Sequence, residues 1–173
     1  FIAGNKDIID YIRYNIRSQI FAKSLPMPLV IGNLKRLELL RTKPELKDML
    51  WANAIKLQKG LLEKGFDIGK TDSVVTPVYM KGGLEEATAM VMDLRENYHI
   101  FCSIVVYPVI PKGNIIYRLI PTAVHTEEEI QTTLTAFEET KKKLDAGAYT
   151  ADNIPDMAEV SAKRFDYMLD KPK

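Results

Sequence analysis

Residues 99–129 read HIFCSIVVYPVIPKGNIIYRLIPTAVHTEEE. Two apolar, β-branched runs, Ile100–Val106 and Ile115–Ile120, flank a turn segment that contains two prolines, a glycine and an asparagine. The pattern predicts two strands joined by a rigid connection. Because successive residues of a strand alternate faces, Ile116 and Arg118 are expected on the same face of the second strand.

Arg118 is the charge that stands out in this stretch. Burying a guanidinium without a partner costs several kcal/mol, so a buried Arg118 requires an anion beside it. The alternative is an arginine on an edge strand whose charged head reaches solvent along its own aliphatic stem. The pattern of residues alone leaves both interpretations open.

The first forty residues predict two helices. Asn5 is a good N-cap, and isoleucines at helical spacing predict an amphipathic helix to about Ile20. Pro26 and Pro28 interrupt the helical pattern, and Pro28 can occupy the first turn of a second helix.

A long helix and a strand are expected next. The segment Thr42–Glu45 resembles a capping box, and Gly65 is a natural end for the helix that follows it. Val74–Met80 reads as a strand, and its Pro77 indicates an edge position or a bulge.

The remaining elements complete a strand, helix, strand, strand, helix order. Leu84–Tyr98 is expected to be helical, and a second capping box at Thr126 begins a helix that runs to about Leu144. A polar linker, residues 145–153, precedes a short last helix that Pro155 opens. The order predicts an α/β chain of the α+β type, with a small, mostly antiparallel sheet and helices on one face.

Composition excludes several classes of protein. The 173 residues carry a net charge of +1 and 46% hydrophobic residues, which suffices for one core. Acidic and basic residues are spread along the chain, without the basic stripe of nucleic-acid-binding proteins. The longest apolar run is too short to cross a membrane, and a single cysteine fits a reducing compartment. We therefore expect a cytoplasmic protein that binds neither nucleic acid nor membrane.

The sequence contains no metal or nucleotide motif. His99 and His125 lack cysteine or carboxylate neighbours at metal-ligand spacing. His125 directly precedes the N-cap Thr126, so a structural hydrogen bond at the turn is expected for its ring. Cys102 lies inside an apolar strand and is expected to pack in the core rather than to react.

The segment from Tyr107 to Thr126, with its Pro-Val-Ile-Pro-Lys-Gly turn, Arg118 and Thr-Ala-Val-His-Thr, resembles the C-terminal signature of the α-oxoamine synthases. These are fold-type-I enzymes that use pyridoxal 5'-phosphate to join an amino acid to an acyl-CoA. The resemblance implies that Arg118 binds the carboxylate of the amino-acid substrate. A bidentate guanidinium–carboxylate pair suits this role.

A second similarity lies in Phe21-Ala22-Lys23-Ser24-Leu25-Pro26. In the family, a Phe-Ser/Thr-x-Ser-Leu-Pro-like segment crosses a dimer interface and contacts the cofactor phosphate of the neighbouring subunit. The resemblance thus implies a homodimer in which Ser24 and Lys23 bind the phosphate, while Ala22 replaces the first hydroxyl residue. Without the resemblance, Ser24 is equally well explained as a loop hydroxyl that caps a turn.

The resemblance also implies a division of the chain. Phe1–Gly4 is similar to the strand that follows the family's cofactor-binding lysine, so no catalytic residue is expected within the chain, and the chain alone is expected to be inactive. Residues 1–41 would be a helical remnant of the cofactor domain, residues 42–145 the C-terminal small domain, and residues 146–173 a linker and helical tail.

The Pro-Val-Ile-Pro-Lys-Gly form is most similar to that of the glycine C-acetyltransferases, which make 2-amino-3-ketobutyrate from glycine and acetyl-CoA. A parent similar to serine palmitoyltransferase or to 8-amino-7-oxononanoate synthase is the first alternative. A non-catalytic, ferredoxin-like module that binds an amino acid or mediates dimerisation is the second, because the element order also allows it.

Overall fold

The computed structural model of the chain describes residues 2–22 and 24–149. The chain divides into two compact units, Phe1–Pro44 and Glu45–Lys173. The helix predicted to begin at Pro155 lies outside the described residues.

The first unit consists of the helices α1 (Lys6–Asn15), α2 (Arg17–Phe21) and α3 (Met27–Thr42). Asn5 caps α1, as predicted, and its Oδ1 accepts a hydrogen bond of 2.9 Å from the backbone N–H of Asp7. The predicted single helix to Ile20 is wrong in one respect. Ile16 adopts an extended conformation (φ −82°, ψ 112°) and separates α1 from α2.

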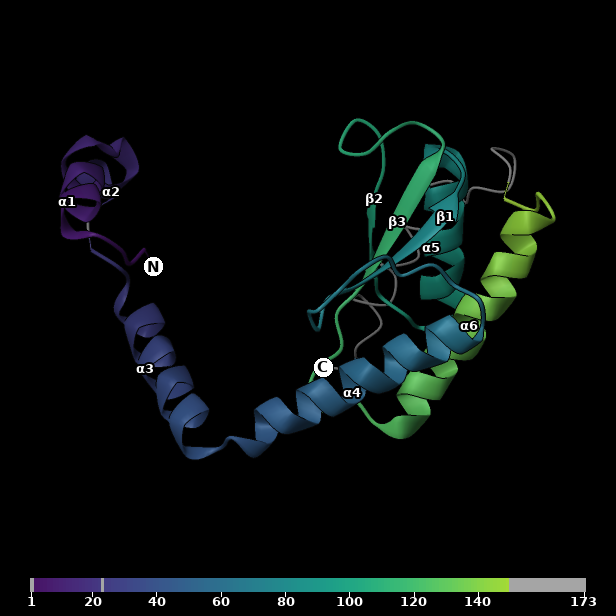
Figure 1. Cartoon of the computed structure of the whole chain (residues 1–173), viewed down its shortest axis with the longest axis horizontal. Helices are drawn as coiled ribbons and strands as arrows, with labels where there is room; N and C mark the ends of the chain where they lie inside the picture. Colours follow the sequence, from purple (N-terminus) through teal and green to yellow (C-terminus); the bar gives the residue numbers. More distant parts are fainter. Residues whose placement is uncertain (1, 23, 150–173) are drawn as a thin grey trace, which may run out of the picture. The chain divides into compact units, whose positions relative to one another are not determined.

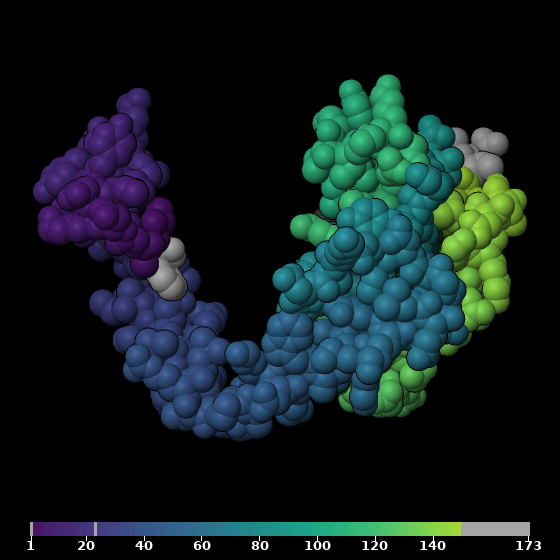
Figure 2. Space-filling view, in the orientation of Figure 1, coloured from purple at the N-terminus to yellow at the C-terminus, as the bar shows by residue number. Residues whose placement is uncertain are grey.

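None of the described residues in these three helices is buried. Large apolar side chains are exposed along all of them, including Ile8, Tyr11, Ile20, Phe21, Leu34 and Leu40. They belong to the purple and blue part of the surface in Figure 2. An apolar surface of this extent is typical of an interface with another part of a protein.

The second unit holds the sheet. It contains α4 (Glu45–Glu63), β1 (Thr76–Lys81), α5 (Leu84–Tyr98), β2 (Ser103–Val105), β3 (Asn114–Leu119) and α6 (Glu127–Asp145). The strand order is β1-β3-β2, both pairs are antiparallel, and α6 packs against α4 and α5 (Figure 1). The predicted fold, a small antiparallel sheet with helices on one face, is confirmed.

Strand β1 is an edge strand, as its Pro77 indicates. Strand β3 lies in the centre of the sheet, between β1 and β2. On the β1 side, its residue Arg118 is the Cα partner of Pro77. On its other side β3 pairs with only three residues of β2, which makes that strand shorter than the predicted Ile100–Val106.

The two predicted capping boxes have different outcomes. At α6, the backbone N–H of Thr126 donates to the Glu129 carboxylate at 2.7 Å, and the Glu129 N–H donates back to the Thr126 hydroxyl at 3.2 Å. At α4 the prediction is wrong. Thr42 is the last residue of α3, and its hydroxyl donates to the carbonyl of Glu38 at 2.9 Å.

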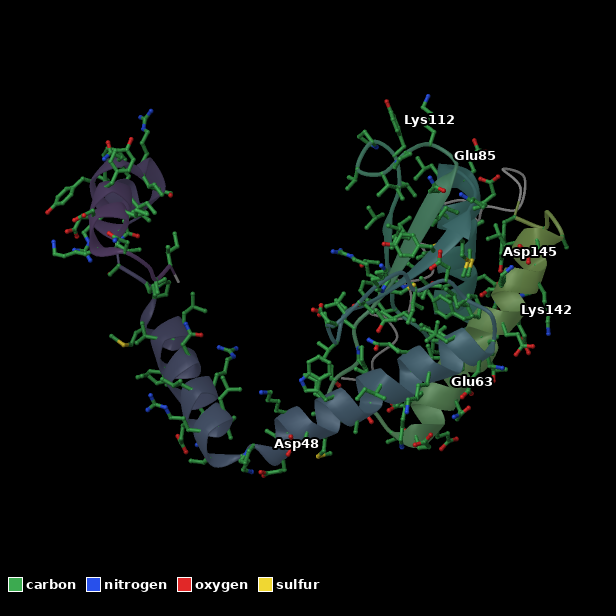
Figure 3. All side chains as sticks on the ribbon, in the orientation of Figure 1. Asp48, Glu63, Glu85, Lys112, Lys142 and Asp145 are labelled. Carbon is green, nitrogen blue, oxygen red and sulfur yellow. The ribbon has the colours of Figure 1, made fainter. Side chains whose placement is uncertain are left out.

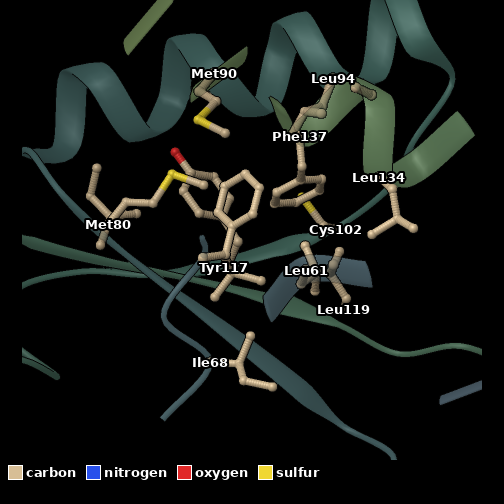
Figure 4. Packing of buried hydrophobic residues seen from close by; sticks show 14 of the residues in the cluster. Leu61, Ile68, Met80, Met90, Leu94, Cys102, Tyr117, Leu119, Leu134 and Phe137 are labelled. Carbon is tan, nitrogen blue, oxygen red and sulfur yellow. The ribbon is translucent and has the colours of Figure 1, made fainter. Parts of the chain in front are cut away.

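The core lies between the sheet and its helices. Its largest fully buried side chains are Tyr117, Phe137, Leu61, Met90, Leu94, Ile115 and Val78 (Figure 4). Cys102 is part of this core, and burial raises the pKa of its thiol to about 11. The prediction of an inert, packed cysteine agrees with both observations.

The hydroxyl of Tyr117 is buried and has no hydrogen-bond partner among the described residues. Burying a polar group costs desolvation free energy, and without a hydrogen bond nothing offsets that cost. We therefore expect Tyr117→Phe to raise the free energy of unfolding of the chain by about 1 kcal/mol. Urea denaturation followed by circular dichroism measures this change.

Tyr149→Phe is the matched control, because the Tyr149 hydroxyl donates to the Asp93 carboxylate at 2.6 Å. Removing a hydrogen bond to a charged group lowers the free energy of unfolding by about 1.5–3 kcal/mol. A loss of similar size in Tyr117→Phe would contradict the prediction.

Candidate functional site

The face of the sheet that points away from the core carries two cross-strand rows that span all three strands, with three side chains in each row. One row is Pro77, Arg118 and Ser103, and the other is Tyr79, Ile116 and Val105. None of the six is buried. We call this surface the open face.

Arg118 lies on the central strand, at the middle of its row. Its side chain is exposed, whereas its neighbours Tyr117 and Leu119 point into the core. The buried interpretation is wrong for this chain, because Arg118 is exposed. The other interpretation is correct in that the charged head reaches solvent, but wrong about the strand, because β3 is central rather than an edge strand.

The Nε–H of Arg118 donates to the hydroxyl of Ser103 at 3.0 Å. Within the described residues, no carboxylate pairs with the guanidinium, and its terminal Nη groups have no protein partner. A guanidinium that is held at one nitrogen and free at the others can bind a carboxylate or another planar anion by donating hydrogen bonds to it.

The segment that follows β3 is held in place by α4. The side-chain amide of Asn53 donates to the carbonyls of Thr122 and His125, at 3.0 and 2.9 Å. The backbone N–H of Thr122 donates to Nδ1 of His125 at 3.0 Å, so the structural role predicted for His125 is confirmed. The sequence contained no signal for Asn53, because its partners lie about seventy residues further along the chain.

A hollow of about 550 Å³ lies beside this segment. Its lining includes Tyr98, Phe101, Ile120, His125 and Ile130, but not Arg118. The hollow and the open face are thus separate features of the second unit.

The connection between β2 and β3, residues 106–113, projects at one end of the unit (Figure 2). Lys112 lies in this connection (Figure 3), and its ammonium stands 5.0 Å from the ring centroid of Tyr107. The turn motif thus forms a loop between β2 and β3, and Arg118 lies on the central strand outside it.

The two other predicted site residues belong to the first unit. Ser24 is exposed in the turn between α2 and α3, and its hydroxyl has no hydrogen-bond partner among the described residues. Lys23 lies outside the described residues. Ser24 and Arg118 therefore belong to different units of the chain, and the pairing of their roles stays a prediction.

Within residues 2–22 and 24–149, no group of three histidine, cysteine, aspartate or glutamate side chains could hold a metal ion. The helices of the same residues are too short or too polar to cross a bilayer.

Comparison with known proteins links the chain to one group of enzymes. It is 58% identical over 153 residues to the cysteate-C-fatty acyltransferase of Capnocytophaga ochracea, covering 88% of this chain and 36% of the relative. It is 35% identical over 130 residues to the serine palmitoyltransferase of Sphingobacterium spiritivorum, covering 75% of this chain and 32% of the relative. The chain thus spans about a third of the length of these relatives. No protein-family model matches it.

The fold agrees with the sequence comparison. A solved structure of serine palmitoyltransferase from S. paucimobilis, with a bound PLP–myriocin aldimine, superposes with a TM-score of 0.70 at 27% identity. The match covers 83% of this chain and 36% of that structure. Both named relatives are acyltransferases.

Proposed function

We propose that this chain, which corresponds in sequence and fold to the C-terminal part of the fold-type-I pyridoxal-phosphate acyltransferases, acts in an enzyme that joins an acyl thioester to an α-amino acid. Arg118 binds the carboxylate of the amino acid. No residue of the chain acts as nucleophile or base in this proposal.

The observation that carries the proposal is the state of Arg118. Its guanidinium is exposed on the central strand, and its terminal nitrogens are free among the described residues. A bidentate pair with a carboxylate restricts both the position and the rotation of the substrate. Such restriction lowers the entropic cost of reaching the transition state, because the reacting Cα is already oriented.

Pyridoxal phosphate, when bound, supplies an electron sink for negative charge that develops at the Cα of the amino acid. The chain's own contribution to its binding is the phosphate contact. Ser24 fits that role, because its exposed hydroxyl has no partner among the described residues and can donate to a phosphate oxygen. We propose that this contact is made across a homodimer interface, which the exposed apolar side chains of α1–α3 would help to form.

We further propose that the amino acid is cysteate and that the acyl group is a fatty acyl chain. The support is the identity of 58% with the cysteate-C-fatty acyltransferase, against 35% with the serine palmitoyltransferase. The pairing of glycine with acetyl-CoA, which the turn motif indicates, is the alternative to this proposal.

A comparison of substrate pairs in the full-length enzyme separates these alternatives. The pyridoxal-phosphate absorbance band reports amino-acid binding, and thiol release reports turnover. With palmitoyl-CoA and cysteate we expect kcat/KM at least tenfold higher than with palmitoyl-CoA and serine, or with acetyl-CoA and glycine. A preference for glycine and acetyl-CoA would overturn the cysteate proposal. Failure of every amino acid to perturb the band would overturn the proposed function.

A further inference from the structure

We propose that Ser103 is a positioning residue for Arg118. By accepting from Nε, it fixes the guanidinium so that the substrate carboxylate is bound end-on by the two terminal nitrogens, Nη1 and Nη2. The inference rests on the proposed function of Arg118 and adds a residue and a binding geometry to it.

The first step is the sheet register. In the antiparallel pair β2–β3, Ser103 is the Cα partner of Arg118, and both side chains lie on the open face. Directly opposed residues of neighbouring strands are the pairs whose side chains interact. The hydroxyl and Nε are 3.0 Å apart, which is a normal hydrogen-bond distance.

The second step is that no other side chain in the row can replace Ser103. On the opposite side, the partner of Arg118 is Pro77, whose side chain has no acceptor. Along β3, the nearest residue on the same face is Ile116, which is apolar. Among the described residues, Ser103 is thus the single side chain that holds the guanidinium.

The third step is the geometry of guanidinium–carboxylate pairs. A guanidinium has five N–H donors in one plane, and a carboxylate can pair with Nε and one Nη or with both Nη groups. Because Ser103 occupies Nε, the pairing through Nε is blocked and the end-on pairing remains. Without Ser103, the long side chain gains rotamers and both modes become available.

The test compares Ser103→Val with Ser103→Thr in the full-length holoenzyme. Threonine and valine have the same shape and both favour strands, but only threonine keeps the acceptor. We expect Ser103→Val to raise KM for the amino acid about tenfold, with kcat changed less than threefold and KM for the acyl thioester unchanged. For Ser103→Thr, KM for the amino acid should stay within about threefold of the value for the unmodified enzyme.

A double variant distinguishes positioning from a direct role. In an Arg118→Lys background, Ser103→Val should change KM for the amino acid less than twofold, because the group that Ser103 positions is gone. A tenfold effect in that background would overturn the inference. So would equal KM values for the valine and threonine variants when Arg118→Lys alone impairs binding. If Arg118→Lys leaves amino-acid binding unchanged, the proposed function fails as well.

Discussion

Arg118→Lys in the full-length enzyme is expected to lower kcat/KM for the amino acid by roughly 30-fold to 4,000-fold. The change keeps the positive charge but removes the planar pair of donors that a carboxylate requires. Loss of a charge-assisted pair of this kind costs about 2–5 kcal/mol, which corresponds to that range of rates. Steady-state kinetics with the amino acid varied at saturating acyl thioester measures the loss.

Arg95→Lys is the matched control. Arg95 belongs to α5 and its guanidinium stacks on the ring of the exposed Phe101, at 5.9 Å from the ring centroid. It is not part of the open face, so the same chemical change should alter kcat/KM less than threefold. If Arg118→Lys and Arg95→Lys behave alike, Arg118 does not bind the carboxylate. The thermal midpoint should be nearly unchanged in both variants, because both side chains are exposed or half-exposed.

Phe137→Ala is expected to have the largest effect on stability. Phe137 is fully buried, and its ring makes edge-to-face contacts with Phe66 and Tyr117, at centroid distances of 6.1 and 6.0 Å. Truncating a buried phenylalanine removes its transfer free energy and leaves a cavity, a loss of about 3–5 kcal/mol. Urea denaturation of the chain, followed by circular dichroism, measures the difference.

The matched control is Phe101→Ala, since the Phe101 side chain is 83% exposed. We expect it to change the free energy of unfolding by less than about 1 kcal/mol. Phe137 joins α6 to the sheet through Tyr117 and to the segment after α4 through Phe66, so its loss loosens both contacts at once. A loss below about 1 kcal/mol for Phe137→Ala would contradict this description of the core.

Several local elements of the second unit could be predicted from the sequence. The predicted bounds of α5, Leu84–Tyr98, are those of the structure, and the capping box at Thr126 begins α6. These features depend on side chains within one helical turn of each other, so a linear sequence contains them. The strands joined by the proline-containing turn, and Pro77 at the sheet edge, follow from similarly local rules.

Local rules were insufficient where a residue has two possible partners. Thr42 has the spacing of an N-cap for α4, yet its hydroxyl donates to Glu38 within α3. Both arrangements satisfy the hydroxyl, and the observed one follows from α3 extending to Thr42. The extended Ile16 between α1 and α2 is similar, because the isoleucine spacing fits one continuous helix as well as two.

The exposure of Arg118 was decided by tertiary structure alone. The alternation of side chains along β3 predicts that Ile116 and Arg118 share a face. Because both faces of this strand carry isoleucine, the sequence does not indicate which face is buried. The core formed on the other face because α5 and α6 pack there, over Ile115 and Tyr117. The partner of Arg118 was likewise invisible in the sequence, since Ser103 lies opposite it only through the pairing of β2 with β3. Cross-strand register is set by the turn and by the packing of the whole sheet, and neither strand contains it alone.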